Sequence, residues 1–237
     1  MFFIVVGIYL LNKQHGYSDG KKPITAIAHD FTLQPGVPLI TVDSATCAAG
    51  KTTLALTQGE FSKDLPDKKP LTWRVPVLAQ TVGSKAPVRV LVSNGKTSLT
   101  LPGCGPVLAN AGQAGYYRVL YAPTAYGALA SSFAKLDPID QLGFMTDTWA
   151  LGISGYQPAS DFLALVKAAQ PDAPSQVWLK AAEVLETLKY YARDDAARSK
   201  AVSSFAIARL SPVMQHIGWD AREGEPADHA VIYLRLM

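Results

Sequence analysis

The sequence has little net charge and no long run of like charges. Its 237 residues carry 22 lysines and arginines against 19 acidic residues, which gives a formal net charge of +3. No stretch gathers the five or six like charges that form the electrostatic patch of a nucleic-acid-binding protein. We therefore expect no nucleic-acid partner.

Long apolar runs are also lacking. The most apolar stretch, residues 1–11, is about half the length of the roughly twenty residues that a helix needs to cross a bilayer. It has neither the preceding basic residues nor the clear cleavage site of a secretory signal. We therefore expect no membrane span here and a helix that packs inside a protein. The chain is expected to be soluble, and its compartment, cytoplasmic or periplasmic, stays open.

Cysteine is scarce, because Cys47 and Cys104 are the only two. They allow one disulfide at most, and their separation fits neither a metal-binding pair nor a Cys-x-x-Cys redox motif. Cys104 has no basic residue or histidine beside it in sequence, which disfavours a reactive thiol. Two interpretations stay open: an unreactive loop cysteine, or a disulfide half with Cys47.

Motifs of catalysis and cofactor binding are missing as well. No two of the four histidines have helical i, i+4 spacing and none is followed by glutamate, so there is no His-Glu-x-x-His metal motif; they are His15, His29, His216 and His229. A phosphate-binding loop at Gly50 would need a glycine where Ala45 stands, so a turn into a strand is the better interpretation. The residues by themselves therefore indicate no catalytic, cofactor-binding or metal-binding site.

What the sequence does contain is an apolar composition arranged in three blocks. Hydrophobic residues make up 49% and charged residues 17%, which is typical of a globular protein. The periodicity changes near residues 34–38 and again near 122–124. We predict a short helical block over 1–36 with two helices, an antiparallel β-sandwich over 37–123, and an all-α, solenoid-like domain over 124–237.

The middle block consists of short alternating runs separated by turn residues. Six strands are predicted, at 37–42, 52–57, 73–78, 88–92, 97–101 and 116–121. Asn94-Gly95 between two of them predicts a tight hairpin. Pro76 inside a run indicates that its strand lies at a sheet edge or at a bulge.

The last block has helical periodicity and recognisable helix starts. Asp137-Pro138 with Asp140 predicts a capped helix start, and further starts are predicted at Ser160-Asp161 and near Ser175. The third helix has an apolar face that includes Tyr191 at its end. A fourth helix is predicted around 202–209 and a fifth from Ser211-Pro212 to Gly218, with Asp194-Asp195 as capping residues.

Six segments occur in an order that matches a known family: 31–42, 54–61, 73–77, 110–119, 137–147 and 211–219. They resemble the later part of the M1 family of zinc aminopeptidases. The most specific match is 110–119, which fits the family pattern N-x-G-x-x-G-[YF]-Y-R-V. In the fifth segment Gln141 stands where the family usually has arginine. The motif residues of the first and fourth segments are Gln34, Pro35, Gly36, Pro38, Gly115, Tyr116, Tyr117 and Arg118.

The resemblance implies a zinc-bearing catalytic domain, followed by a β-sandwich and a helical C-terminal domain that encloses a peptide chamber. The family's His-Glu-x-x-His motif, its Gly-x-Met-Glu-Asn segment and its catalytic tyrosine have no counterpart here, so zinc is expected in a missing catalytic domain. Residues 1–36 then resemble the end of that domain, and the helical domain is incomplete.

The implied function is therefore the non-catalytic C-terminal portion of an M1-type aminopeptidase, inactive alone, with the catalytic domain and a peptide as partners. The alternative is a free-standing peptide- or protein-binding module built on the same scaffold. A hydrolase with unrecognised chemistry is a third and weaker possibility.

Overall fold

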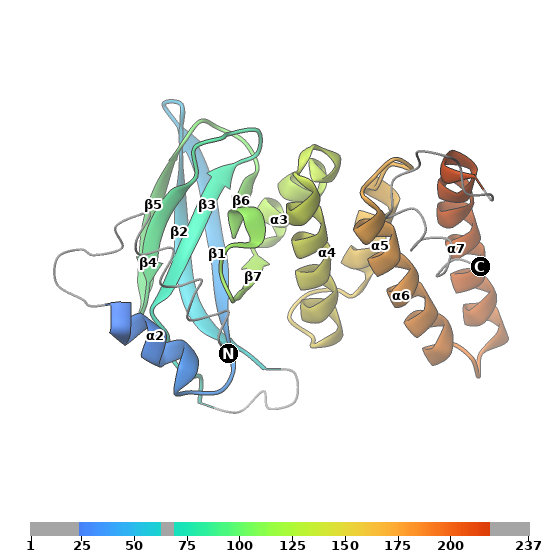
Figure 1. Cartoon of the computed structure of the whole chain (residues 1–237), viewed down its shortest axis with the longest axis horizontal. Helices are drawn as coiled ribbons and strands as arrows, with labels where there is room; N and C mark the ends of the chain where they lie inside the picture. Colours follow the sequence, from blue (N-terminus) through green and yellow to red (C-terminus); the bar gives the residue numbers. More distant parts are fainter. Residues whose placement is uncertain (1–23, 63–68, 219–237) are drawn as a thin grey trace. The chain divides into compact units, whose positions relative to one another are not determined.

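The computed structural model describes residues 24–62 and 69–218, which form parts of two compact units that divide between Leu129 and Ala130 (Figure 1). The helix predicted at 1–11 and the segment that ends at Trp219 lie wholly or partly outside the described residues. The second half of the predicted helical block is confirmed, since helix α2 covers Ile24–Thr32 and buries Ile27.

The first unit is a sandwich of two sheets. The four-stranded sheet has the order β5-β2-β1-β7, with β1 at Val37–Ala48, β2 at Lys51–Phe61, β5 at Lys96–Pro102 and β7 at Arg118–Tyr121. The three-stranded sheet has the order β4-β3-β6, with β3 at Val75–Thr81, β4 at Val88–Val92 and β6 at Val107–Ala109. All six predicted strands form and the sandwich is confirmed, whereas the short β6 was missed. One pairing departs from the antiparallel prediction, because β7 runs parallel to β1.

Period-two alternation explains the core of this unit. In β3 the residues Val75, Val77 and Ala79 are fully buried and the residues between them are half-buried. Leu54 and Leu56 of β2 are also fully buried. Because successive side chains of a strand point to opposite faces, these positions form the layer between the two sheets.

The hairpin predicted at Asn94-Gly95 is wrong. The residues around Gly95 connect β4 to β5, and these strands lie in different sheets: β4 pairs with β3, and β5 pairs with β2. The two-residue hairpin is instead at Ala49-Gly50 between β1 and β2, with φ of 49° and 72°. Positive φ at both positions is the geometry that fits the twist of a tight hairpin. Gly50 is therefore part of the turn that leads into β2, as the sequence predicts.

Pro76 lies in the central strand of its sheet, yet it has a neighbour on one side only. It pairs with Leu91 of β4, whereas β6 pairs with β3 only over Ala79–Thr81 in the described part of the chain. A proline has no N–H to donate to a neighbouring strand, so it is tolerated at a position of β3 that β6 does not reach. The prediction of an edge strand is therefore wrong, because β3 is the central strand, although Pro76 itself has a ladder partner on one side only.

Helix α3, at Pro123–Ala130, closes the first unit, and the second unit consists of helices packed on one another. Its helices are α4 at Pro138–Ile153, α5 at Ser160–Ala168, α6 at Ser175–Tyr191 and α7 at Ala196–Ile217. The three predicted starts at Pro138, Ser160 and Ser175 are confirmed. None of the described helices is both long and apolar enough to span a bilayer.

The fourth and fifth predicted helices form one helix, α7, with Pro212 inside it. A proline inside a helix removes one backbone hydrogen bond. Here the following turn is held by packing, because Val213, Met214 and Ile217 are buried. The helix ends at Gly218 as predicted, with φ of 89° and its N–H donating to the Met214 carbonyl oxygen.

Two capping and burial predictions need correction, and two are confirmed. Asp140 lies in the first turn of α4 as predicted, where it is 2% exposed. Asp137 precedes α4 in extended conformation, but its side chain makes no capping hydrogen bond. Tyr191 is 71% exposed, because it lies at the very end of α6. The capping role of Asp195 is confirmed, since its side chain accepts a hydrogen bond from the Arg198 N–H at 3.0 Å.

An arginine joins three helices of the second unit. Arg209 of α7 donates from Nη2 to the Ala169 carbonyl oxygen at 2.8 Å and from Nε to that of Val166 at 3.2 Å. Its guanidinium also lies 6.0 Å from the ring of Trp178 in α6. Cationic donors at the last carbonyls of a helix are stabilising, so Arg209 closes the C-terminal end of α5.

Candidate functional site

The described residues do not gather metal ligands. Among residues 24–62 and 69–218 there is no group of three or more histidine, cysteine, aspartate or glutamate side chains that could hold a metal ion. His29 lies in α2 and His216 in α7, while His15 and His229 fall outside the described residues. The candidate site described below consists of the family-motif residues.

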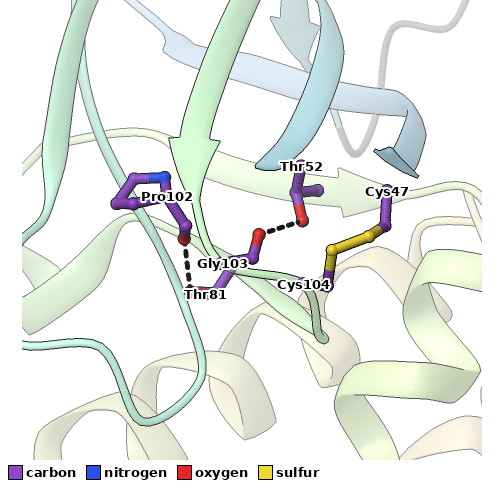
Figure 2. Close-up of a disulfide and its surroundings, with 6 residues drawn as sticks. All are labelled: Cys47, Thr52, Thr81, Pro102, Gly103 and Cys104. Atoms are coloured by element: carbon purple, nitrogen blue, oxygen red, sulfur yellow. Dashed lines mark hydrogen bonds between the residues drawn. A yellow bond between two sulfur atoms is a disulfide. The ribbon is translucent and has the colours of Figure 1, made fainter. Parts of the chain in front are cut away.

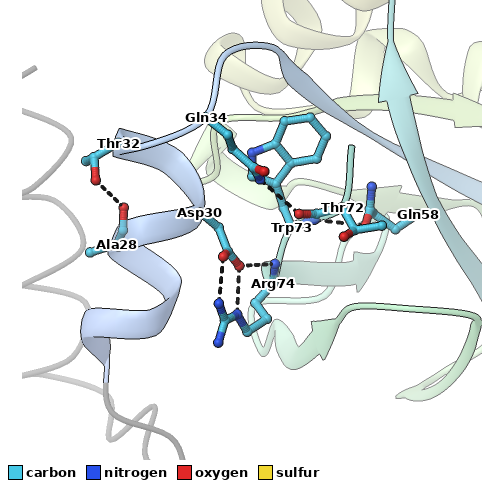
Figure 3. A network of polar contacts seen from close by, with 8 residues as sticks. All are labelled: Ala28, Asp30, Thr32, Gln34, Gln58, Thr72, Trp73 and Arg74. Carbon is cyan, nitrogen blue, oxygen red and sulfur yellow. Dashed lines mark hydrogen bonds and ion pairs between the residues drawn. The ribbon is translucent and has the colours of Figure 1, made fainter. Parts of the chain in front are cut away.

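The first motif group lies where α2 joins the sandwich. Gln34, Pro35 and Gly36 form the connection between α2 and β1, and Pro38 lies in β1 opposite Glu60. The Gln34 side chain donates from Nε2 to the Thr72 carbonyl oxygen at 2.8 Å (Figure 3). The motif thus ties the end of α2 to the segment that leads into β3.

An ion pair from α2 holds the same segment. Arg74 donates from Nε to Oδ2 of Asp30 at 2.7 Å and from Nη2 to Oδ1 at 2.6 Å, and its backbone N–H donates to Oδ2 at 2.7 Å (Figure 3). The Asp30 side chain is 15% exposed and that of Arg74 32%. Bidentate pairs of this kind fix orientation as well as charge. Asp30 and Gln34 together therefore orient α2 on the sandwich.

Side chains of β2 hold the other side of this segment. Glu60 accepts at Oε2 from the Leu71 N–H at 2.8 Å, and Gln58 accepts at Oε1 from the Trp73 N–H at 3.1 Å. Gln58 also donates from Nε2 to the Leu71 carbonyl oxygen at 3.3 Å. Residues 71–74 are not a strand, so these side chains replace the ladder bonds that a strand would supply.

Gly36 fits where no larger residue would. Its φ is +108°, and a Cβ added to it would lie 2.7 Å from Oε1 of Glu60 and 3.2 Å from the ring of Trp73. Trp73 is itself 2% exposed. Both the backbone conformation and the tight contact therefore require glycine at this motif position.

The ion pair shifts the pKa of both partners. Burial raises the pKa of Asp30, but the side-chain and backbone hydrogen bonds from Arg74 and its positive charge together outweigh burial, so the pKa lies below the ordinary value. The hydrogen bonds that Arg74 donates to the Asp30 carboxylate raise the pKa of Arg74. The pair is therefore ionised at neutral pH.

Asp30→Asn is expected to lower the free energy of unfolding by about 1 to 2 kcal/mol at pH 7, because charge-assisted hydrogen bonds to Arg74 are lost. A carboxyl whose pKa is lowered by folding stabilises the folded state at pH values above its unfolded pKa, which is about 3.9. This stabilisation is lost as the pH falls through the pKa of the folded state. The difference between the variant and the parent should therefore shrink below about pH 4 in urea titrations from pH 2 to 7.

The control is Asp194→Asn, which breaks an exposed pair with Arg193 at 3.6 Å and should change stability little. An equal cost of Asp30→Asn at pH 3 and at pH 7 would show that the ionised carboxylate is not the source of the stabilisation.

The second motif group is organised by Asn110. Its backbone has φ of 135°, its Oδ1 accepts from the Gly115 N–H at 2.9 Å, and its Nδ2 donates to the Gly115 carbonyl oxygen at 3.0 Å. A Cβ on Gly115 would overlap the ring of Tyr117. The asparagine and the glycine therefore close a compact loop that leads into β7.

The residues of this loop face different surroundings. Tyr117 is 6% exposed, whereas its neighbour Tyr116 is 55% exposed. Arg118 begins β7, pairs with Leu39 of β1, and has its guanidinium 5.3 Å from the centre of the Phe61 ring. Because Pro38 precedes Leu39, the two motif groups meet on neighbouring strands. Tyr116 is the exposed aromatic residue of this motif.

A disulfide joins Cys47 of β1 to Cys104, which lies in the segment after β5 (Figure 2). The Thr52 hydroxyl donates to the Gly103 carbonyl oxygen at 2.8 Å, and the Thr81 hydroxyl donates to that of Pro102 at 3.1 Å. The Gly103 N–H donates to the Gly50 carbonyl oxygen at 2.9 Å. The disulfide interpretation, one of the two left open by the sequence, is the one that the structure shows.

Sequence reasoning missed most of the polar residues that hold the motifs in place. Asp30 and Arg74 are far apart in sequence, and no local pattern pairs them. Gln58 and Glu60 lie beyond the predicted strand 52–57 and were included only in the family segment 54–61. Asn110 was the exception, because it begins the most specific motif.

Comparisons with known proteins give one matching family model and several relatives that match most of the chain. The model of the ERAP1-like C-terminal domain matches residues 106–237. Aminopeptidase M1-A of Oryza sativa is 26% identical over 218 residues, which cover 86% of this chain and 24% of the relative. Tricorn protease-interacting factor F2 of Thermoplasma acidophilum is 23% identical over 85% of the chain and 25% of its own length. Glutamyl aminopeptidase of Bitis rhinoceros is 23% identical over 90% of the chain and 23% of its own length. The chain thus spans about a quarter of the length of these relatives.

Proposed function

The chain belongs to the family of ERAP1-like C-terminal domains, and from this membership we propose that it is the non-catalytic C-terminal portion of an M1-type zinc aminopeptidase. In this role it shapes the chamber that holds the peptide and has no activity by itself. The observation that carries the proposal is the family match over residues 106–237. The named aminopeptidases that match most of the chain support it.

The donor chemistry of the described residues does not fit a zinc site. Zinc in enzymes is held by three protein ligands drawn from histidine, acidic residues and cysteine. No such group occurs in residues 24–62 or 69–218, and the two described cysteines are joined in a disulfide. We propose that zinc is held by the catalytic domain of the enzyme.

Two exposed apolar residues support a role inside a larger protein. Leu33 directly follows α2 and is 76% exposed, and Tyr116 of the second motif is 55% exposed. Large apolar side chains next to family motifs are candidates for an interface. We propose that Leu33 and Tyr116 contact the catalytic domain, with Gln34, Gly36, Gly115 and Arg118 holding them in position.

The test is aminopeptidase activity of this chain alone on chromogenic amino-acid anilides with added zinc, combined with metal analysis of the purified protein. We expect no turnover and no stoichiometric zinc. Turnover that a chelator abolishes would contradict the proposal, because it would require a zinc site in the chain itself. A matched His216→Ala variant would then show whether that residue contributes.

One observation favours the second candidate, a free-standing peptide- or protein-binding module. The sandwich has its own buried core and its own disulfide, which are properties of a unit that folds independently. Sedimentation over a range of concentrations separates the two candidates. A stable monomer favours the module, whereas self-association favours a portion that has lost the partner of its apolar residues.

A further inference from the structure

The four-stranded sheet has an open edge along the second half of β1. The parallel ladder between β1 and β7 covers Leu39–Val42 and ends opposite Tyr121. Beyond it, within the described residues, β1 is paired only with β2 on its other side. Residues 43–48 are all exposed. An edge of this kind presents backbone N–H and C=O groups that another extended chain can pair with.

A bulge and a cavity lie at the point where β7 ends. The register of β1 against β2 shifts between Val42 and Ser44, so Asp43 is the extra residue of a bulge. Bulges re-aim side chains and are enriched near functional sites. Asp43, Ser44 and Ala45 line a cavity of about 260 Å³. Its other walls include Pro106, which precedes β6, and Ala128, which lies in α3.

Size and charge indicate what the cavity can hold. At about 260 Å³ it lies below the range of about 300–1,000 Å³ that is usual for cofactor and drug-sized ligands, so a single side chain fits it better. Asp43 carries the one charge among the lining residues, and its Oδ1 accepts a hydrogen bond from the Thr57 hydroxyl at 3.3 Å. A basic side chain therefore complements this cavity.

We propose that the edge of β1 from Ser44 onward, with the cavity at Asp43, binds an extended peptide that carries a lysine or arginine. The peptide continues the sheet where β7 leaves it, and its basic side chain lies against the Asp43 carboxylate. Backbone pairing gives affinity and the side-chain cavity gives selectivity, as in other cases of strand addition. This proposal does not depend on the proposed function.

The test uses the full chain and a fluorescent, acetylated hexapeptide of alternating valine and lysine, with binding followed by anisotropy. We expect saturable binding, and a loss of binding when the central residues of the peptide are replaced by proline, which cannot form the ladder. Replacing lysine by glutamate should also abolish it. Asp43→Asn should weaken binding about two- to fivefold, as for an exposed charge pair, and should reduce its salt dependence.

Two further variants locate the site. Ala128→Leu places a larger side chain at the cavity wall on an exposed helix position and should block the peptide, while Asp194→Asn, in the second unit, should have no effect. Thermal melting checks that both variants fold. Equal binding of the proline-containing peptide, no binding at millimolar peptide, or full binding to Ala128→Leu would each overturn the proposal. Concentration-dependent pairing of two copies at this edge, unaffected by Asp43→Asn, would also overturn it.

Discussion

Removing the disulfide between Cys47 and Cys104 is expected to lower the free energy of unfolding of the first unit by up to about 4 kcal/mol. The two cysteines are 57 residues apart, so the bond closes a long loop in the unfolded chain and lowers its entropy. In the folded state the hydrogen bonds of Gly103, Thr52 and Thr81 hold the same segment. The effect should therefore appear in stability, with little change of structure.

The measurement is urea unfolding with and without a thiol reductant, followed by hydrogen exchange at the buried amides of β2 and β3. A double variant, Cys47→Ser with Cys104→Ser, should match the reduced protein and should not respond to the reductant. A loss of less than about 1 kcal/mol would mean that the unfolded chain already keeps these segments close together.

Gly36→Ala is expected to lower the free energy of unfolding by about 2 to 4 kcal/mol. Part of the loss is the positive φ of +108°, which a residue with a Cβ adopts at a cost. The rest is the overlap of the new methyl group with Glu60 and Trp73. Relief of that overlap would disturb the hydrogen bond from Leu71 to Glu60.

Alanine substitutions at two other glycines separate the cost of the positive φ from the cost of the steric overlap. Gly50 has a positive φ of +72° with nothing within 4 Å of an added Cβ, so Gly50→Ala should show the backbone cost alone, about 1 kcal/mol. Gly59 has open space and no positive φ, so Gly59→Ala should be close to neutral or slightly stabilising. If Gly36→Ala costs no more than Gly50→Ala in urea titrations, the contact with Trp73 is not tight enough to matter.

Six of the seven described strands were predictable because each has a strong local pattern, whereas the three-residue β6, which is buried at every position, has no alternation. The alternation in β3 and the turn residues around it depend on neighbours in sequence, and burial alternates accordingly. Pairing partners were not predictable. Asn94-Gly95 has ideal hairpin residues, yet β4 and β5 belong to different sheets, because apolar packing decides which strands are neighbours.

The motif residues were recognisable, but the contacts that hold them were not. Asn110 and Gly115 could be found because both belong to one short pattern. Asp30 and Arg74 meet only after the helix and the sheet are in place, and neither has a local signal for the other. The same limit explains α7, since a proline and a serine look like a helix start unless the packing of Val213 and Met214 is known.

The parallel pairing of β7 with β1 has a consequence for the order of folding. The β1–β2 hairpin needs only a two-residue connection, whereas Leu39 and Arg118 must meet across most of the sandwich sequence. Pairings between distant segments form late, because the entropy of loop closure opposes them until other contacts exist. The strand that follows the most specific motif is therefore expected to dock last. The loop that precedes this strand is closed by hydrogen bonds between Asn110 and Gly115, which are near in sequence, so we expect it to form before the strand docks.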